Sequence, residues 1–272
     1  MSRCIGLLFP LLLALFPLVN LQSESSGLEL GFRSGFGERI PGRFDSDLNQ
    51  FSSTFSPTIV SDLNIRGGKS IQTYDLFIRW ILDSHSKFGF TIGRNDWQKL
   101  NLTEVTSDFY FTRLDSTIYS YHVLGMYYFN YPLSRNFEWE AGLGLGFTSA
   151  DWSIRGYSIG EPPPNTQFFR QRGILRGSGI AYRAETAINR RLTDNTFLQL
   201  GIAYHHTAID KFSGNYNGES SSFYIRSDGR VGVFDDTRII DLNVSSAQSF
   251  RRLDMNTGAW TLYFSVFKRF LD

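Results

Sequence analysis

The chain has 272 residues, an aromatic content of 16% and almost balanced charge, with 27 Lys and Arg against 26 Asp and Glu. This balance excludes the strong global attraction to phosphate that binding to nucleic acid or to an anionic membrane surface depends on. The only cysteine is Cys4, so everything after it has no disulfide, no thiol nucleophile and no cysteine-bound metal.

Residues 1–22 have the pattern of a secretory signal peptide. Arg3 precedes an apolar run from Ile5 to Val19, which is too short to cross a membrane comfortably as a helix. We expect cleavage between residues 22 and 26, with an uncleaved membrane anchor as the alternative. No later apolar run is long enough for a membrane-spanning helix, and residues 27–272 are expected to form one all-β domain.

Eight segments after this leader alternate between large apolar and polar or small residues, which predicts β-strands. In chain order the predicted strands are 27–35, 71–82, 87–94, 117–131, 137–147, 178–189, 196–206 and 257–270.

The fifth of these strands has the most informative faces. One face is large and apolar: Phe137, Trp139, Leu143, Leu145 and Phe147. The opposite face carries Glu138, Glu140 and three glycines, which is too little side-chain volume for a water-exposed exterior. This arrangement fits a barrel whose outer wall meets lipid and whose narrow lumen is crowded.

The predicted links alternate between short and long. The short links are 83–86, 132–136 and 190–195, and the long ones are about 36–70, 95–116, 148–177 and 207–256. Strict alternation puts all long links at one rim, as in bacterial barrels with short periplasmic turns and long extracellular loops. We therefore predict an eight-stranded antiparallel up-and-down transmembrane β-barrel, with a lipocalin-like barrel or a sandwich as the alternative.

The final predicted strand, 257–270, alternates aromatic and polar residues from Trp260 to Phe270 and nearly ends the chain. With the topology, it resembles the small eight-stranded bacterial outer-membrane barrels of the OmpA-membrane-domain, OmpX and OmpW kind. Lys268, Leu271 and Asp272 depart from the usual ending on phenylalanine. The resemblance implies the outer membrane of a Gram-negative bacterium, contact with its lipid and lipopolysaccharide, and insertion by the barrel assembly machinery.

Charged residues of both signs are expected on the lumen side of several strands. They are Glu29, Arg33, Asp75, Arg79, Glu138, Glu140, Arg183 and Glu185. Because an eight-stranded barrel is just wide enough for side chains to fill it, these groups are expected to form a plug of ion pairs. A narrow, ion-selective pore lined by the same groups is the alternative.

Two pairs of residues are candidates for catalysis. Ser120 and His122 share a face and could act as nucleophile and base. His205 and Thr207 resemble the His-x-Ser arrangement of barrel enzymes that deacylate lipid A, with Thr in place of Ser. Asp83-Ser-His85 has one spacing of the omptin proteases but falls in a predicted periplasmic turn. No metal or cofactor motif is present.

The long links are expected to carry the function, since loops on a rigid scaffold commonly bind partners. The leading interpretation is a non-enzymatic barrel with a structural role or an extracellular or host ligand bound by its loops. The alternative is a small OmpW-like pore for ions or small apolar solutes. A barrel enzyme that acts on lipid A or on peptides is the third hypothesis. The apolar residues in 223–225 and 231–234 suggest an extra hairpin above the membrane or strands that extend beyond it.

Overall fold

The computed structural model describes residues 27–48, 60–67, 69–106, 111–160, 167–226, 231–236 and 250–271. The predicted signal segment 1–22 and its cleavage region lie outside these residues. Within the described ranges, no helix is both long and apolar enough to cross a membrane.

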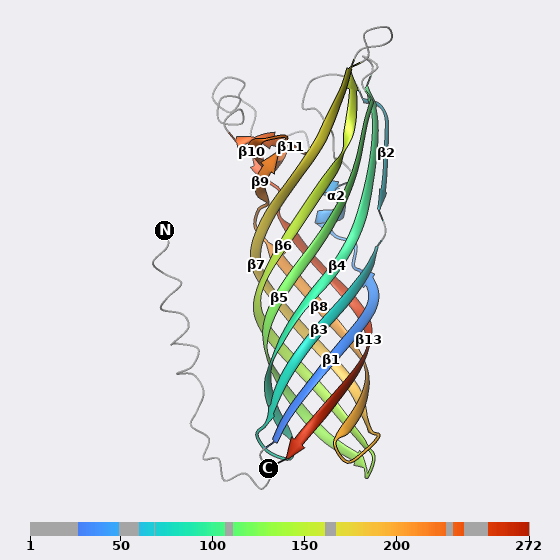
Figure 1. The fold of residues 1–272 in the computed structure, drawn as a ribbon, viewed down its shortest axis with the longest axis vertical. Helices are drawn as coiled ribbons and strands as arrows, with labels where there is room; N and C mark the ends of the chain where they lie inside the picture. Colours follow the sequence, from blue (N-terminus) through green and yellow to red (C-terminus); the bar gives the residue numbers. More distant parts are fainter. Residues whose placement is uncertain are drawn as a thin grey trace, which may run out of the picture.

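Eight antiparallel strands form a closed ring (Figure 1). They are β1 (Gly27–Arg39), β3 (Ser70–Ile81), β4 (Ser86–Thr106), β5 (Phe111–Ser134), β6 (Phe137–Gly160), β7 (Gln167–Arg191), β8 (Thr196–Ile209) and β13 (Met255–Leu271). Each strand pairs with its neighbours in chain order, and β1 closes the ring against β13 from Gly27↔Leu271 to Arg39↔Ala259. The predicted eight-stranded antiparallel barrel is therefore confirmed.

The side chains of the ring lie on the predicted faces. On β6, Leu143, Leu145 and Phe147 are 63–71% exposed, whereas Glu140 on the other face is 2% exposed. The same apolar exterior continues around the ring, for example at Ile92 of β4. A band of about ten residues per strand matches the length of a tilted strand that crosses a bilayer, so the exterior is built to meet lipid.

Arginine in place of Leu143 tests this exterior, because Leu143 lies near the middle of the apolar band on β6. We expect Leu143→Arg to reduce the free energy of unfolding by about 2–4 kcal/mol in lipid vesicles, since the charge must be buried in hydrocarbon. Ser149→Arg, on the same face just beyond Phe147, is the matched control and should cost about 0–1 kcal/mol. Equal losses in guanidinium unfolding curves would contradict a lipid-facing wall.

Strands β4 to β7 continue far above the apolar band, where we predicted the long links 95–116 and 148–177 (Figure 1). In this extension the alternation reverses. Trp152 and Ile154 of β6 point inward and are buried, whereas Arg155 points outward and is exposed. Water replaces lipid above the membrane, so the polar face turns outward as in a soluble sheet. An apolar outer face therefore identifies strands only up to the membrane boundary. Beyond it the same criterion predicts loops where the structure has strands.

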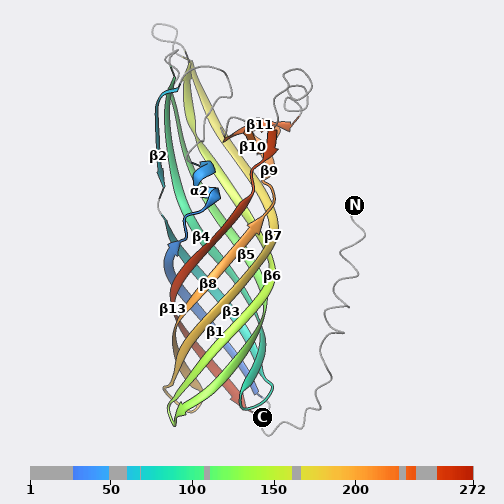
Figure 2. The ribbon, with the colours of Figure 1, turned by 180° about the vertical axis from the view of Figure 1, so that it is seen from behind.

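The other two long links contain short elements. They are α2 (Arg43–Leu48), β2 (Val60–Gly67), β9 (Ser213–Tyr216), β10 (Glu219–Arg226), β11 (Val231–Asp235) and β12 (Phe250–Arg252). Strand β2 pairs with the upper part of β4, from Val60↔Thr106 to Gly67↔Leu100, and so continues the wall, whereas the other elements fold towards the opening. Strands β10 and β11 pair antiparallel from Ser221↔Asp235 to Ile225↔Val231, as the predicted hairpin requires. We call α2 together with residues 210–226, 231–236 and 250–254 the cap. Figure 2 shows α2 within the upper part of the cylinder and β9 to β11 beside the first half of β7.

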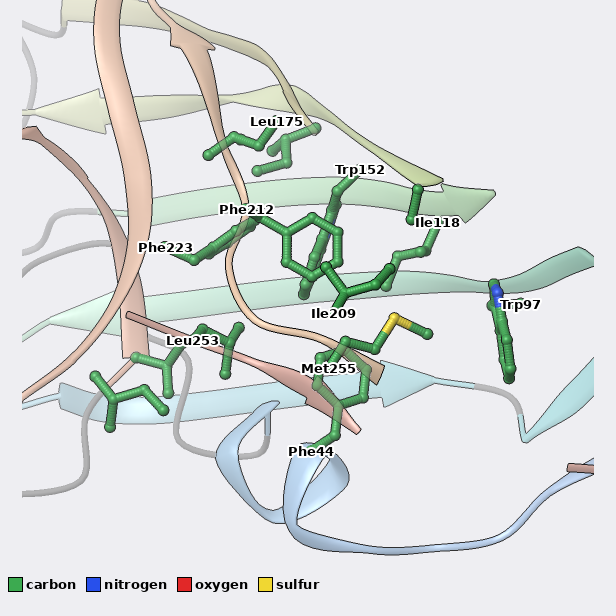
Figure 3. Packing of buried hydrophobic residues seen from close by; sticks show 14 of the residues in the cluster. Phe44, Trp97, Ile118, Trp152, Leu175, Ile209, Phe212, Phe223, Leu253 and Met255 are labelled. Atoms are coloured by element: carbon green, nitrogen blue, oxygen red, sulfur yellow. The ribbon is translucent and has the colours of Figure 1, made fainter. Parts of the chain in front are cut away.

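The cap and the inner faces of the extended strands share an apolar core (Figure 3). Trp152 lies at its centre, with its ring 4.1 Å from the ring of Phe223 and 5.3 Å from that of Phe212, measured between centroids. Phe44 brings α2 onto the edge of the same indole at 5.8 Å. Because these side chains are almost fully buried, the core closes the barrel at the end opposite the short turns.

Candidate functional site

The lumen below the cap core is the first place where polar chemistry gathers. The structure puts all eight expected charges, from Glu29 to Glu185, on the inner face of the ring. Seven of them are no more than 7% exposed, and Glu138 is partly exposed near the periplasmic end. Such burial requires each charge to have a partner.

An upper network joins four strands. Arg33 of β1 makes a bidentate pair with Glu185 of β7, with N–O distances of 2.6 and 2.9 Å. Arg183 reaches the same carboxylate at 2.6 Å and also donates to Asp75 at 2.6 Å. Asp75 in turn lies 3.1 Å from Nε2 of His122. The result is two cations and two anions packed between β1, β3, β5 and β7.

A lower network lies towards the periplasmic turns. Arg79 donates to Glu140 at 2.6 Å and pairs with Glu29 at 2.8 Å. Lys87 bridges the same two carboxylates, at 2.8 Å to Glu140 and 3.1 Å to Glu29. Arg269 of β13 binds Glu29 and makes a bidentate pair with Glu138.

The two networks are connected and neutral. Gln199 of β8 accepts from Arg33 at 3.3 Å and donates to Glu140 at 2.8 Å. Five cations therefore face five anions across one continuous plug: Arg33, Arg79, Lys87, Arg183 and Arg269 against Glu29, Asp75, Glu138, Glu140 and Glu185. Aromatic rings fill the space between them, with the guanidinium of Arg33 4.1 Å from the ring centre of Tyr263.

Lys87, Arg269 and Gln199 belong to this plug but were missing from our expected set of charges. Each has the sequence parity of the inward residues of its strand: Lys87 precedes Gly89, and Arg269 follows Ser265 at even spacing. The predicted strands 87–94, 196–206 and 257–270 contain all three residues, so the alternation alone assigns them to the inner face. Gln199 carries no charge and so falls outside a set of charged residues.

Glycines on neighbouring strands make room for these long side chains. Gly93 is the register partner of Asp75, Gly142 that of Glu185 and Gly144 that of Arg183. A Cβ atom at Gly93 would run into the Asp75 carboxylate and the His122 ring. The glycines of the inner face are therefore part of the packing of the plug.

Gly93→Ala tests this packing. The added methyl group must push Asp75 or His122 aside, so we expect the free energy of unfolding to fall by about 1–3 kcal/mol. Gly125→Ala on the adjoining strand β5 is the matched control, because a Cβ there meets only ordinary contacts at 3.8 Å and beyond. Urea unfolding of both refolded variants gives the comparison, and an equal loss at the two positions would argue against a crowded lumen.

The four residues proposed for catalysis also lie in the lumen. Ser120 accepts a hydrogen bond from the indole of Trp97 at 2.6 Å, and His122 is bound to Asp75. Nε2 of His205 lies 3.0 Å from the Thr261 hydroxyl, and Thr207 is 1% exposed. The structure thus gives Ser120 and His122 separate partners and puts His205 and Thr207 on the face away from lipid. No group of three His, Cys, Asp or Glu suited to a metal occurs among the described residues.

His85 stays at the periplasmic end, where the structure has a tight turn. The Asp83 carboxylate accepts from the backbone N–H of His85 at 2.7 Å and from the Ser86 hydroxyl. These hydrogen bonds lower the pKa of Asp83, because they stabilise its ionised form. The Asp83-Ser-His85 segment acts as a turn in this structure.

A closed ring of eight antiparallel strands, with an apolar band outside and a charged, filled interior, is the architecture of a small outer-membrane β-barrel. That is the class of fold to which the chain belongs.

No protein-family model and no curated protein matches the chain. Among solved structures it is similar to the outer membrane protein OprG from Pseudomonas aeruginosa, with 10% identity, 91% of this chain and 96% of that chain covered, and a TM-score of 0.37. It is also similar to Ail, the attachment invasion locus protein of Yersinia pestis, with 11% identity, coverage of 91% and 99%, and a TM-score of 0.34. Likenesses this distant assign no function.

Proposed function

We propose that this protein is a non-conducting barrel of the bacterial outer membrane, delivered by a signal peptide, whose extracellular extension serves as a surface for interaction. In this role the membrane-spanning ring is an anchor and a rigid scaffold. The outer faces of β4 to β7 and the cap then present binding groups above the lipid. No enzymatic step is assigned to any residue of the barrel.

The observation that supports a closed barrel is the filled lumen. Arg33, Arg79 and Arg183 reach across the interior and are at most 1% exposed. Each is held by two carboxylates or by a carboxylate and an amide, so an ion would have to break several buried pairs to pass. Above them, the apolar core around Trp152 forms a second barrier, in which a hydrated ion would meet mostly hydrocarbon side chains.

Single-channel recording of the refolded protein in planar bilayers tests this proposal. We expect no stable unit conductance from the wild-type protein at neutral pH. A general porin recorded in the same bilayers checks that the assay detects an open barrel. A reproducible unit conductance from the wild type would overturn the closed-barrel proposal in favour of a small pore.

Activity on lipid A is tested separately by mass spectrometry of lipid A from cells with and without the protein. An unchanged acyl pattern is the result we expect, because His205 and Thr207 face the lumen. Loss of an acyl chain that depends on His205 would replace the proposal with a barrel enzyme.

A further inference from the structure

Arginines gather on the outward face of β5, β6 and β7 above the membrane boundary. Two adjacent cross-strand rows contain them: Arg113, Tyr157 and Arg170 in one, and Asp115, Arg155 and Arg172 in the other. Their side chains are exposed or partly exposed to solvent. Four guanidinium groups thus share this face with one carboxylate.

These arginines form no ion pair in the described part of the chain. None of the four lies within ion-pair distance of a carboxylate there, whereas nearby Arg176 reaches Asp151 at 3.1 Å. In the ladder Arg155 lies directly opposite Arg172 on one side and opposite Asp115 on the other. Like charges in directly opposed positions destabilise a sheet, and one carboxylate does not balance four guanidinium groups, so an anion bound beside Arg172 would stabilise this face.

An open pocket adjoins Arg172. It has a volume of about 430 Å³ and is lined by Arg170 and Arg172 of β7, by Asn215 of β9 and by Asn217 of the β9–β10 turn, together with Gly173, Ile174 and Gly218. Two cationic forks and two amide side chains are donors that suit a carboxylate, sulfate or phosphate.

The turn beside the pocket is held in place before any ligand arrives. Asn217 has a φ of 55° and accepts from the backbone N–H of Arg172 at 2.9 Å. Its amide and the Tyr216 hydroxyl both donate to Gln171, at 2.7 and 2.8 Å. Burial raises the pKa of Tyr216, which keeps its hydroxyl protonated as a donor. A preorganised wall lowers the entropy cost of binding.

The height of this face limits what it can bind. Arg155 follows Phe147, the last large apolar residue of the lipid-facing band on β6, by eight positions. At about 3.3 Å per residue and a tilt of roughly 40°, it stands about 20 Å above the apolar band. Lipid headgroups at the bilayer surface are therefore below its reach, while carbohydrate chains around the cell extend to this level.

We propose that this face binds an acidic polysaccharide, with one carboxylate or sulfate in the pocket of Arg170 and Arg172 and the next beside Arg155. The arginines follow a line across three strands, which suits a linear polyanion. Tyr157, 37% exposed between Arg113 and Arg170, supplies an aromatic face for a sugar ring. The inference rests on the proposed function and names the ligand class of its extracellular surface.

Isothermal titration calorimetry of the refolded full chain in uncharged detergent micelles tests the proposal. The probes are a chondroitin sulfate hexasaccharide and an oligogalacturonate hexamer, with neutral maltohexaose as the control sugar. We expect saturable binding of at least one acidic probe that weakens as salt rises. Arg155→Gln with Arg172→Gln should raise its Kd about tenfold or more, because two charge-assisted contacts are lost. Arg176→Gln, which removes a paired arginine from the same face, should change the Kd less than about twofold.

The inference would be overturned if neither acidic probe binds or if maltohexaose binds equally well. An unchanged Kd in the double variant would also overturn it, provided that this variant still shows the heat-dependent gel shift of a folded barrel. A further arm uses nanodiscs with and without anionic lipid. Competition by the anionic lipid for the same arginines would assign the face to the membrane and reject a polysaccharide. Conductance is a separate readout, so a conducting barrel that still binds the acidic sugar would refute only the closed lumen.

Discussion

Glu140→Gln is expected to destabilise the folded barrel by about 3–5 kcal/mol, because it leaves two buried cations short of a partner. Glu140 accepts from Arg79 at 2.6 Å, from Lys87 at 2.8 Å and from Gln199 at 2.8 Å. A neutral amide has one acceptor oxygen and adds donors where donors already converge. Equilibrium unfolding in urea, followed by tryptophan fluorescence and by the gel shift on heating, measures the loss.

Two companion variants make this prediction specific to charge balance. Adding Lys87→Met to Glu140→Gln removes one charge of each sign, so the double variant should be more stable than Glu140→Gln alone. Asp194→Asn breaks the ion pair with Arg191 in an exposed turn and should leave the unfolding midpoint almost unchanged, because solvent screens this pair. If the double variant is less stable than Glu140→Gln, the stability of the barrel depends more on individual contacts in the lumen than on the balance of charge there.

The membrane-spanning part of this fold was predictable from the sequence because lipid imposes a simple rule. Apolar residues must face outward along about ten residues of every strand, and the alternation of β1, β3, β4 to β8 and β13 follows that rule. The residues between these apolar positions must then point inward, which is how the same pattern identified Arg33, Asp75 and Glu185. Local periodicity is therefore enough to predict where these strands lie, their order, and which face of each strand carries the charges.

The pairing of the charges and the structure above the membrane needed information that local periodicity does not contain. Arg33 and Glu185 are 152 residues apart, and only the register of every intervening strand brings them together. Above the boundary, lipid no longer selects the outer face, so the strands of 148–177 follow the opposite pattern. The sequence Asn217-Gly218 predicts a two-residue hairpin turn within a predicted loop, because both residues readily adopt the positive φ angles that such a turn needs.

This reversal of pattern divides the barrel into two parts with different sources of stability. The membrane part is held by lipid outside and by ion pairs inside. The extracellular part is a water-exposed sheet that must bury its own apolar face, and the cap supplies the surface that covers it. The cap should therefore loosen on its own when its core is damaged, while the ring in the membrane stays folded.

Trp152→Ala tests this independence and is expected to cost about 3–5 kcal/mol within the cap, since it removes the largest side chain at the centre of that core. Phe44, Phe212 and Phe223 all lose their contact with the indole. We expect limited trypsin digestion to cut the cap about 100-fold faster or more, as the open state becomes more populated. Mass spectrometry of the fragments locates the cuts at Lys211 and Arg251.

Two other substitutions separate the loss of packing from side effects. Trp152→Phe keeps an aromatic ring and removes an indole nitrogen that has no hydrogen-bond partner within the described structure, so it should loosen the cap much less. Phe168→Ala removes a side chain that is 70% exposed on the outer face of β7 and should leave digestion unchanged. If Trp152→Ala also unfolds the ring at the same urea concentration at which the cap opens, cap and ring form one cooperative unit and their stability is shared.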